Sequence, residues 1–131
     1  KVTLTTGKKA GASNVFQNSP AYGGDLGVDG DLDTRWATDA GTKQAWLEVD
    51  LGKPVTFSRV GIEEAYAGRV QSFELQAWEG EKWKTFHTGT TIGESFSATF
   101  APITAQRVRL NILVASEGPT ISEFQLFAPE K

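Results

Sequence analysis

Hydrophobic and polar residues alternate along several short stretches of the chain, as expected for β-strands with one buried face. The stretch 46–51 places Leu47, Val49 and Leu51 on one side. No segment sustains the three-four apolar spacing of an amphipathic helix. The alternation therefore predicts an all-β fold, an eight-stranded antiparallel β-sandwich, with strands over 2–5, 46–51, 57–63, 72–78, 82–87, 96–100, 107–114 and 121–127.

Two polar segments interrupt these strands. The first, 6–25, is rich in Gly, Ser, Asn and Pro and shows neither period, so it predicts a long loop. The second covers 38–44, and a tight hairpin is expected over 79–81. Long ordered loops tend to carry function. With 131 residues and no linker or repeat, the chain is expected to form one domain over 1–131.

The stretch 29–33 holds three carboxylates in five residues and suggests a calcium-binding loop. Calcium accepts carboxylate, hydroxyl and carbonyl oxygens in loose geometry, and Gly30 permits the bend that turns such groups inward. A solvated acidic turn accounts for the same spacing, because Asp and Gly are ordinary turn residues. An EF-hand is excluded, since its required Gly and Glu are replaced by Thr34 and Ala40.

Composition narrows the classes of partner. The formal charge is −3, and the 13 Lys and Arg residues are spread along the chain, so neither nucleic acid nor a membrane partner is expected. Without Cys, the chain forms no disulfide and no thiolate zinc site. No apolar stretch is long enough to span a bilayer, and 1–4 lacks the apolar core of a signal peptide. A module cut from a larger protein is expected.

Catalysis finds little support in the sequence. Glu63 and Glu64 are adjacent on an expected strand and would point to opposite faces, unlike the paired carboxyl groups of a glycosidase. His87 is the one histidine, and no Gly-x-Ser-x-Gly elbow accompanies it. We therefore predict that the chain is not an enzyme.

Four motifs in order resemble the discoidin, or coagulation-factor C-type, domain: VDGDLDTRW at 28–36, WLEVDLG at 46–52, RVRL at 107–110 and ISEF at 121–124. The microbial branch of that family includes the family-32 carbohydrate-binding modules. Shorter stretches at 68–70, 90–93 and 119–124 resemble the C-terminal region of bacterial family-29 α-L-fucosidases. The resemblance implies an eight-stranded jelly-roll sandwich.

The resemblance also implies a structural calcium ion that joins the acidic loop to the last strand. By position, Asp29 and Glu123 would offer carboxylates, and Asp31 and Thr34 side-chain or backbone oxygens. Leu26 and Ser122 would add backbone carbonyls. Such a site would stabilise the folded state, because the unfolded chain cannot form it.

Family members bind sugar with loops at one end of the sandwich, where aromatic rings stack on the sugar and polar groups fix its hydroxyls. Tyr22 and Tyr66 are the expected platforms, although Tyr22 could instead pack its own loop. Arg69 could grip hydroxyls or pair with an acid. The expected ligand contacts are Tyr22, Asp39, Glu64, Tyr66, Arg69 and Glu117, and Gln17 and Asn18 lie in the same loops.

One departure from the family concerns galactose. Galactose-binding members carry a His after the Trp of the acidic loop, an Arg and an Asn after the fourth strand, and an aromatic before the final Glu. Those positions here hold Ala37, Glu64, Ala67 or Gly68, and Gly118 or Pro119. The module is therefore expected to use other residues for another sugar, or to have lost binding.

The leading hypothesis is a non-catalytic carbohydrate-binding module for galactose- or fucose-containing glycan. It would be a monomeric unit covalently linked to a glycosidase, in the secreted, periplasmic or cell-surface compartment of a bacterium. The alternative is a structural accessory domain of a fucosidase without a glycan site. Lipid binding, as in the animal clotting-factor relatives, is disfavoured by the acidic balance and polar loops.

Overall fold

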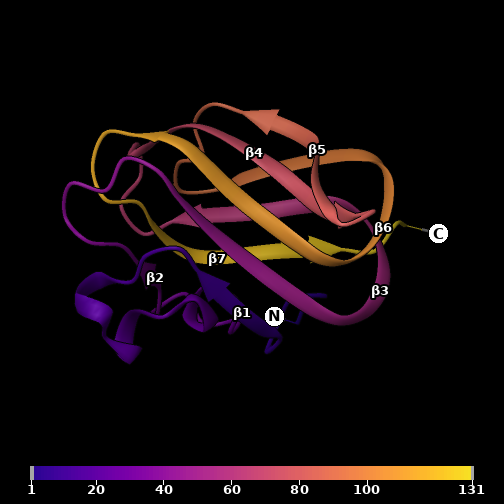
Figure 1. Ribbon diagram of the computed structural model, residues 1–131, viewed down its shortest axis with the longest axis horizontal. Coiled ribbons are helices and arrows are strands. Elements are labelled where there is room, and N and C mark those ends of the chain that lie inside the picture. The colour runs from indigo at the N-terminus through magenta and orange to yellow at the C-terminus, as the bar shows by residue number, and fades with distance from the viewer. Residues whose placement is uncertain (1, 131) are drawn as a thin grey trace.

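The computed structural model describes residues 2–130 and shows a two-layered β-sandwich (Figure 1). Two strands are long, and each turns back at one end of the molecule so that it contributes to both layers. The strands are β1 (Lys9–Ala12), β2 (Trp36–Ala37), β3 (Ala45–Glu64), β4 (Val70–Glu79), β5 (Lys82–Gly89), β6 (Phe96–Ala115) and β7 (Thr120–Phe127). Three 3₁₀ turns, η1 (Phe16–Asn18), η2 (Pro20–Tyr22) and η3 (Gly24–Gly27), precede β2.

Every strand pair is antiparallel, in the order β2-β7-β3-β6-β4-β5, and β1 pairs with the first part of β3. The first part of β3 also pairs with the second part of β6, which continues to β4 and β5. The second part of β3 lies between β7 and the first part of β6. Register shifts at 50–55 and 57–59 mark the region where β3 bends. The all-β antiparallel sandwich is thus confirmed.

The strand boundaries differ from the sequence prediction in three places. The expected strands 46–51 and 57–63 are one strand, β3, and 96–100 and 107–114 are one strand, β6, because pairing continues around each bend. Residues 2–5 form no strand; a turn covers residues 4–7, in which the buried Thr5 hydroxyl donates to the Phe124 carbonyl at 2.8 Å. The expected loop 6–25 contains β1, which forms because it pairs with the edge of β3.

The hairpin over 79–81 is confirmed. Glu79 pairs with Lys82, and the two intervening residues, Gly80 and Glu81, have φ angles of 57° and 62°. Positive φ at both central positions is the geometry of a type I′ turn, whose twist matches that of the flanking strands.

The core lies between the layers and is formed by the apolar positions that alternate along the strands. Its largest fully buried side chains include Trp36, Phe57, Phe73 and Phe124. The indole N–H of Trp36 donates to the Asn14 carbonyl at 2.9 Å, so this ring also fixes the loop before η1. Within residues 2–130, no helix is both long and apolar enough to cross a membrane.

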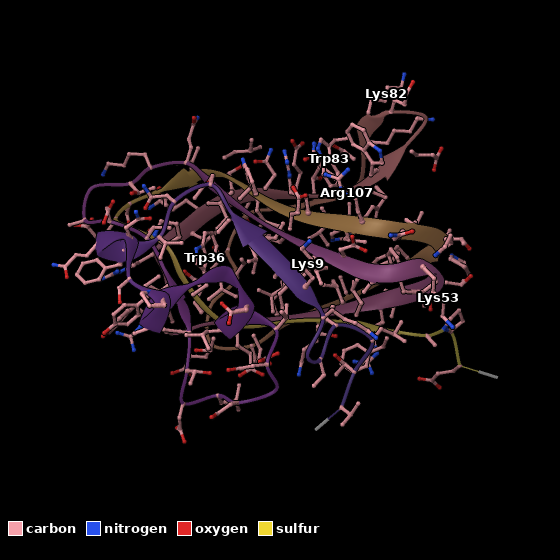
Figure 2. All side chains as sticks on the ribbon, turned by 60° about the horizontal axis from the view of Figure 1, so that its bottom comes forward. Lys9, Trp36, Lys53, Lys82, Trp83 and Arg107 are labelled. Carbon is pink, nitrogen blue, oxygen red and sulfur yellow. The ribbon has the colours of Figure 1, made fainter. Side chains whose placement is uncertain are left out.

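The outer face of β3, β6, β4 and β5 carries a ladder of alternating indole and guanidinium groups, and Figure 2 labels Trp83 and Arg107 within it. The Arg109 guanidinium carbon lies 4.2 Å from the ring centroids of both Trp46 and Trp83. The Arg107 carbon lies 4.8 Å from Trp78 and 5.2 Å from Trp83. Such cation–π contacts attach four strands to one another through their side chains.

One carboxylate holds both arginines of this ladder. Glu48 accepts from Arg107 at Oε1 and from Arg109 at Oε2, each at 2.8 Å. Burial alone would raise the pKa of Glu48, but the hydrogen bonds from Arg109 and Arg107 outweigh it and hold this pKa below its ordinary value. The ladder is therefore a structural element in which two guanidinium groups share one carboxylate.

We expect Glu48→Gln to lower the free energy of unfolding by about 1–2 kcal/mol, because hydrogen bonds to charged groups contribute about 1.5–3 kcal/mol each. The lowered folded-state pKa means that this stabilisation is present above the ordinary carboxyl pKa and is lost as the pH falls through the folded-state value. Urea denaturation at several pH values measures it. The exposed Glu79–Lys84 pair is the matched control, and Glu79→Gln should change stability by less than about 0.5 kcal/mol. Equal effects of the two variants would contradict the ladder's role.

Candidate functional site

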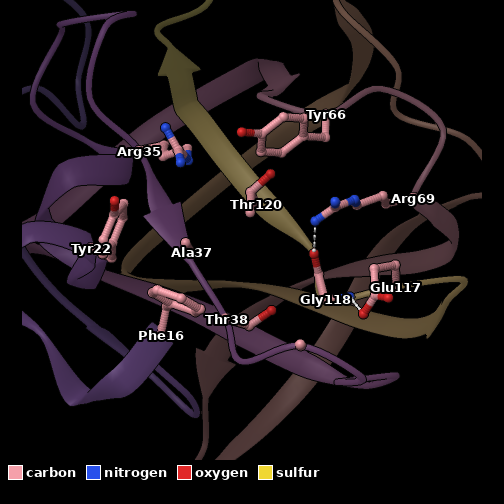
Figure 3. Close-up of a pocket in the computed structure, with 11 residues that line it drawn as sticks. Phe16, Tyr22, Arg35, Ala37, Thr38, Tyr66, Arg69, Glu117, Gly118 and Thr120 are labelled. Carbon is pink, nitrogen blue, oxygen red and sulfur yellow. Dashed lines mark hydrogen bonds between the residues drawn. The ribbon is translucent and has the colours of Figure 1, made fainter.

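A pocket of about 380 Å³ opens where the loop with η1 and η2 meets the loops 65–69 and 116–119 (Figure 3). Residues from four separate segments of the chain therefore share one cavity. Aromatic, guanidinium, hydroxyl and carboxylate groups stand around small residues in its wall. It is lined by Phe16, Tyr22, Arg35, Ala37, Thr38, Ala40, Tyr66, Arg69, Glu117, Gly118 and Thr120.

Tyr22 stands on one side of the pocket. It ends η2, which Pro20 begins and the Ser19 hydroxyl caps by accepting the Ala21 N–H at 3.2 Å. Its ring meets that of Phe16 edge-on, with centroids 5.4 Å apart. The expectation that Tyr22 faces the site and the alternative that it packs its own loop are therefore both met.

Tyr66 stands on the opposite side with 49% of its surface exposed. Its ring is flanked by two guanidinium groups, Arg69 at 4.6 Å and Arg35 at 5.4 Å from the ring centroid. Arg35 also lies 5.2 Å from the Tyr22 ring. As Figure 3 shows, Arg35 thus lies between the two tyrosines.

The third side of the pocket is fixed by main-chain hydrogen bonds. Arg69 donates through Nη1 to the Gly118 carbonyl at 2.8 Å. Glu117 Oε1 accepts the N–H groups of Gly41 at 2.6 Å and Gly118 at 2.8 Å. The hydrogen bonds from Gly118 and Gly41 hold the pKa of Glu117 below its ordinary value. Glu117 therefore presents a negative charge at this rim.

Two buried polar atoms of the pocket residues have no hydrogen-bond partner among residues 2–130. They are Nε of Arg35 and Oγ1 of Thr120. Neither Arg35 nor Arg69 forms an ion pair within that part of the chain. Since buried polar groups in proteins are nearly always paired, we expect water or a ligand to satisfy these two atoms.

Glu64 does not line the pocket, although a sugar contact was expected from it. It is 5% exposed, and its carboxylate accepts the N–H groups of Gly68 at 3.2 Å, Val70 at 2.9 Å and Gly93 at 2.7 Å. These bonds hold the loop that carries Tyr66 and Arg69. Glu64 is thus a positioning residue.

Asp39 also lies outside the pocket wall. Its Oδ1 accepts the Gln17 N–H at 2.7 Å, and its own N–H donates to the Asn14 side chain at 2.7 Å. Gln17 and Asn18 have left-handed φ angles of 51° and 54°, which cost energy in non-glycine residues. Asp39 therefore holds a strained loop in place.

The structure brings together the other expected contacts, Tyr22, Tyr66, Arg69 and Glu117. Sequence reasoning missed Phe16 and Arg35. An aromatic ring inside the polar segment 6–25 was a usable signal for Phe16. No sequence signal marked Arg35 as a pocket residue, because it directly follows the acidic loop and precedes the buried Trp36.

The acidic loop is closed by its own carboxylates. Asp29 accepts the Asp31 N–H at 3.0 Å and the Thr34 hydroxyl at 2.5 Å, and Asp31 Oδ1 accepts the Asp33 N–H at 2.8 Å. Gly30 has a φ of 79° and donates its N–H to Glu123 Oε1 at 2.6 Å. This last bond attaches the loop to β7.

Glu123 is 1% exposed, and its Oε2 is buried without a partner among residues 2–130. Burial, and next the nearby Asp29 carboxyl, raise the pKa of Glu123 to about 7. An unpaired buried oxygen beside a second carboxyl group fits a cation. Within the described part of the chain no group of three or more His, Cys, Asp or Glu side chains is placed to hold a metal, so backbone oxygens would have to complete the ligand set.

The family model of the F5/8 type C domain matches residues 9–124. Among curated protein sequences, none matches this chain significantly.

Three solved structures are similar over nearly the whole chain. Chitosan-binding module 1, from a chitosanase/glucanase of Paenibacillus sp. IK-5, is 29% identical with a TM-score of 0.87, covering 98% of this chain and 100% of that one. A GH29 fucosidase of Ruminococcus gnavus, in complex with fucose, is 25% identical with a TM-score of 0.87, covering 99% of this chain and 27% of the fucosidase. The family 32 CBM of NanJ from C. perfringens, in complex with galactose, is 21% identical with a TM-score of 0.77, covering 90% of this chain and 91% of that one, and supports the fold alone.

We expect Glu64→Ala to destabilise the domain by about 3 kcal/mol, because it leaves buried N–H groups without their charged acceptor. Loop 65–69 would loosen, and sugar affinity would fall with it. Thermal denaturation measures the stability loss. Glu94→Ala is the control, since Glu94 is exposed, is next to Gly93, and its side chain forms no hydrogen bond or ion pair within residues 2–130. The positioning role is refuted if the two variants melt at the same temperature.

Proposed function

The chain belongs to the F5/8 type C domain family, and from this premise we propose that it is a non-catalytic carbohydrate-binding module. The observation that carries the proposal is the pocket at the loop end of the sandwich. Tyr22 and Tyr66 face it from separate segments, and Arg35 and Arg69 stand beside their rings.

This arrangement suits a sugar for physical reasons. The apolar C–H faces of a pyranose stack on aromatic rings, and a few fixed polar groups select the orientation of its hydroxyls. The cavity of about 380 Å³ lies in the size range of small-molecule sites, about 300–1,000 Å³. Arginine, with its planar set of donors, can bind two ligand oxygens at once.

The similar structures support sugar as the ligand class. They include chitosan-binding modules of a chitosanase/glucanase and a GH29 fucosidase in complex with fucose. We propose a galactose- or fucose-containing glycan as the ligand, and the fucosidase likeness supports fucose. Ala37 and Gly118 occupy pocket positions where galactose-binding relatives carry larger groups, so the ligand contacts differ from theirs.

The biological role that follows is targeting. This chain spans only 27% of the R. gnavus fucosidase, which supports covalent linkage to a glycoside hydrolase. Binding of glycan by the module would raise the effective substrate concentration for the attached enzyme. Glycan outside the cytoplasm of a bacterium is the expected setting.

We also propose a structural calcium ion at the acidic loop. Its ligands would be the carboxylates of Asp29 and Glu123 and the Thr34 hydroxyl, with Asp31 and the backbone carbonyls of Leu26 and Ser122. The buried, unpaired Oε2 of Glu123 is the observation that supports it. Calcium would neutralise the two neighbouring carboxylates and join the loop to β7.

We expect the isolated domain to bind galactosylated or fucosylated structures on a glycan array. Tyr66→Ala should weaken binding roughly ten-fold, because aromatic stacking and its buried area contribute about 1.5 kcal/mol. Trp83→Phe, which alters a ring on the outer sheet face, is the control and should bind as the native domain does. A blank array from folded, calcium-loaded protein would favour a structural accessory domain.

We expect calcium to stabilise the domain by about 2.7 kcal/mol when its concentration is about 100 times Kd. Thermal denaturation with calcium, with magnesium and with chelator measures this linkage. Asp29→Asn and Glu123→Gln should abolish the calcium effect. Asp33→Asn is the matched control, because the Asp33 side chain is exposed on the same loop. Calcium stabilisation that survives in Glu123→Gln would rule out the proposed ligand set.

A further inference from the structure

We propose that the sugar unit occupying the pocket carries a single negative charge, and that Arg35 and Arg69 recognise its anionic group. The inference rests on the proposed sugar-binding function and narrows the unit in the pocket to a charged sugar within a galactose- or fucose-containing glycan. A uronic acid is the ligand class that fits best, because a planar carboxylate matches the guanidinium fork.

The first argument is the charge of the pocket wall. Its charged side chains are two arginines and one glutamate in a chain with a net charge of −3, so this pocket is a positive region on an acidic protein. Neither arginine forms an ion pair among residues 2–130. Glu117, the one acid, already accepts two main-chain N–H groups through Oε1.

The second argument is the contrast with the sheet-face arginines. Arg107 and Arg109 also lie against aromatic rings, yet both are paired with Glu48 at 2.8 Å. Arg35 and Arg69 have the same aromatic contacts without the carboxylate. A ligand carboxylate would pair with Arg35 and Arg69 in the pocket as Glu48 pairs with Arg107 and Arg109 in the ladder.

The third argument is the set of unsatisfied donors. Nε of Arg35 is buried without a partner among the described residues, as is Nε of Arg109 in the ladder, but in the pocket the Thr120 hydroxyl oxygen is unpaired as well. A buried polar group without a hydrogen bond is destabilising unless something satisfies it. A carboxylate only accepts hydrogen bonds, so its oxygens are complementary to donors from Arg35 and Arg69.

The fourth argument concerns geometry and selectivity. Both guanidinium groups lie within 5.4 Å of the Tyr66 ring centroid, so a sugar held against the exposed part of this side chain would bring its substituent within reach of either. Glu117, on the other rim, repels a second negative charge, which favours one anionic group per bound unit. The same charges disfavour the ammonium groups of chitosan, despite the likeness to chitosan-binding modules.

The test compares methyl galactoside with methyl galacturonide, which differ in the oxidation of C6. Galactose 6-sulfate is the third ligand and shows whether the pocket prefers a sulfate or a carboxylate as the charged group. Isothermal titration of the native domain, near 0.05 M and near 0.5 M NaCl, measures affinity. We expect the galacturonide to bind about ten-fold more tightly at low salt, because charge-assisted hydrogen bonds are roughly twice as strong as neutral ones. The preference should shrink at high salt, where the Debye length approaches about 4 Å.

Substitutions in the pocket show which side chains cause the preference for the galacturonide. Arg35→Gln should bring the galacturonide-to-galactoside affinity ratio close to one, and Arg35→Lys should restore only part of it, because lysine keeps the charge without the planar fork. Arg69→Gln should act in the same direction. Glu117→Gln should raise the ratio by removing the opposing charge. Melting temperatures verify that each variant is folded.

The outcomes separate the two proposals. Equal or tighter binding of the galactoside, or a preference for chitotriose, would overturn the anionic ligand and leave the sugar-binding function standing. If galactose 6-sulfate binds more tightly than the galacturonide, the ligand is anionic but its charged group is not a carboxylate. If no sugar binds and the glycan array is also blank, both proposals fail.

Discussion

The pocket depends on a buried carboxylate that never touches its cavity. Glu64 sits at the end of β3, and its oxygens hold three main-chain N–H groups from the loop 65–69, the start of β4 and the segment before β6. A buried charge is tolerated only when it is hydrogen-bonded in this way. Tyr66 and Arg69 belong to the loop that Glu64 holds, so the geometry of the site depends on these hydrogen bonds to the Glu64 carboxylate.

The same principle explains the different roles of the arginines. On the sheet face, Glu48 pairs with both Arg107 and Arg109 and makes them part of the scaffold. In the pocket, Arg35 and Arg69 stack on tyrosines without a neutralising partner. Arg35 and Arg69 therefore lie in the pocket wall, where the carboxylate of a ligand could pair with them.

The sequence predicted the strands whose own residues alternate between apolar and polar. It did not predict the strands and contacts that depend on residues far apart in the chain. Alternation located β4, where every second residue is buried along 73–77, whereas β5 has no buried residue and β7 is buried at consecutive positions. It missed β1, whose residues have no such pattern and which forms by pairing with β3. In the site, loop position identified Tyr22, Tyr66 and Arg69. Loop position could not show that the Glu64 side chain is buried rather than exposed. Nor could it predict that Arg35 would lie between two tyrosines from different loops.

Amide chemical-shift mapping by NMR, with the calcium-loaded domain titrated by methyl galacturonide, tests the central claim most directly. If the loop pocket is the sugar site, the largest shifts occur at Tyr22, Arg35, Tyr66, Arg69 and Gly118, and the amides of the indole–guanidinium ladder stay unchanged. Shifts centred on Trp46, Trp78 and Trp83 would place the ligand on the sheet face and contradict the account.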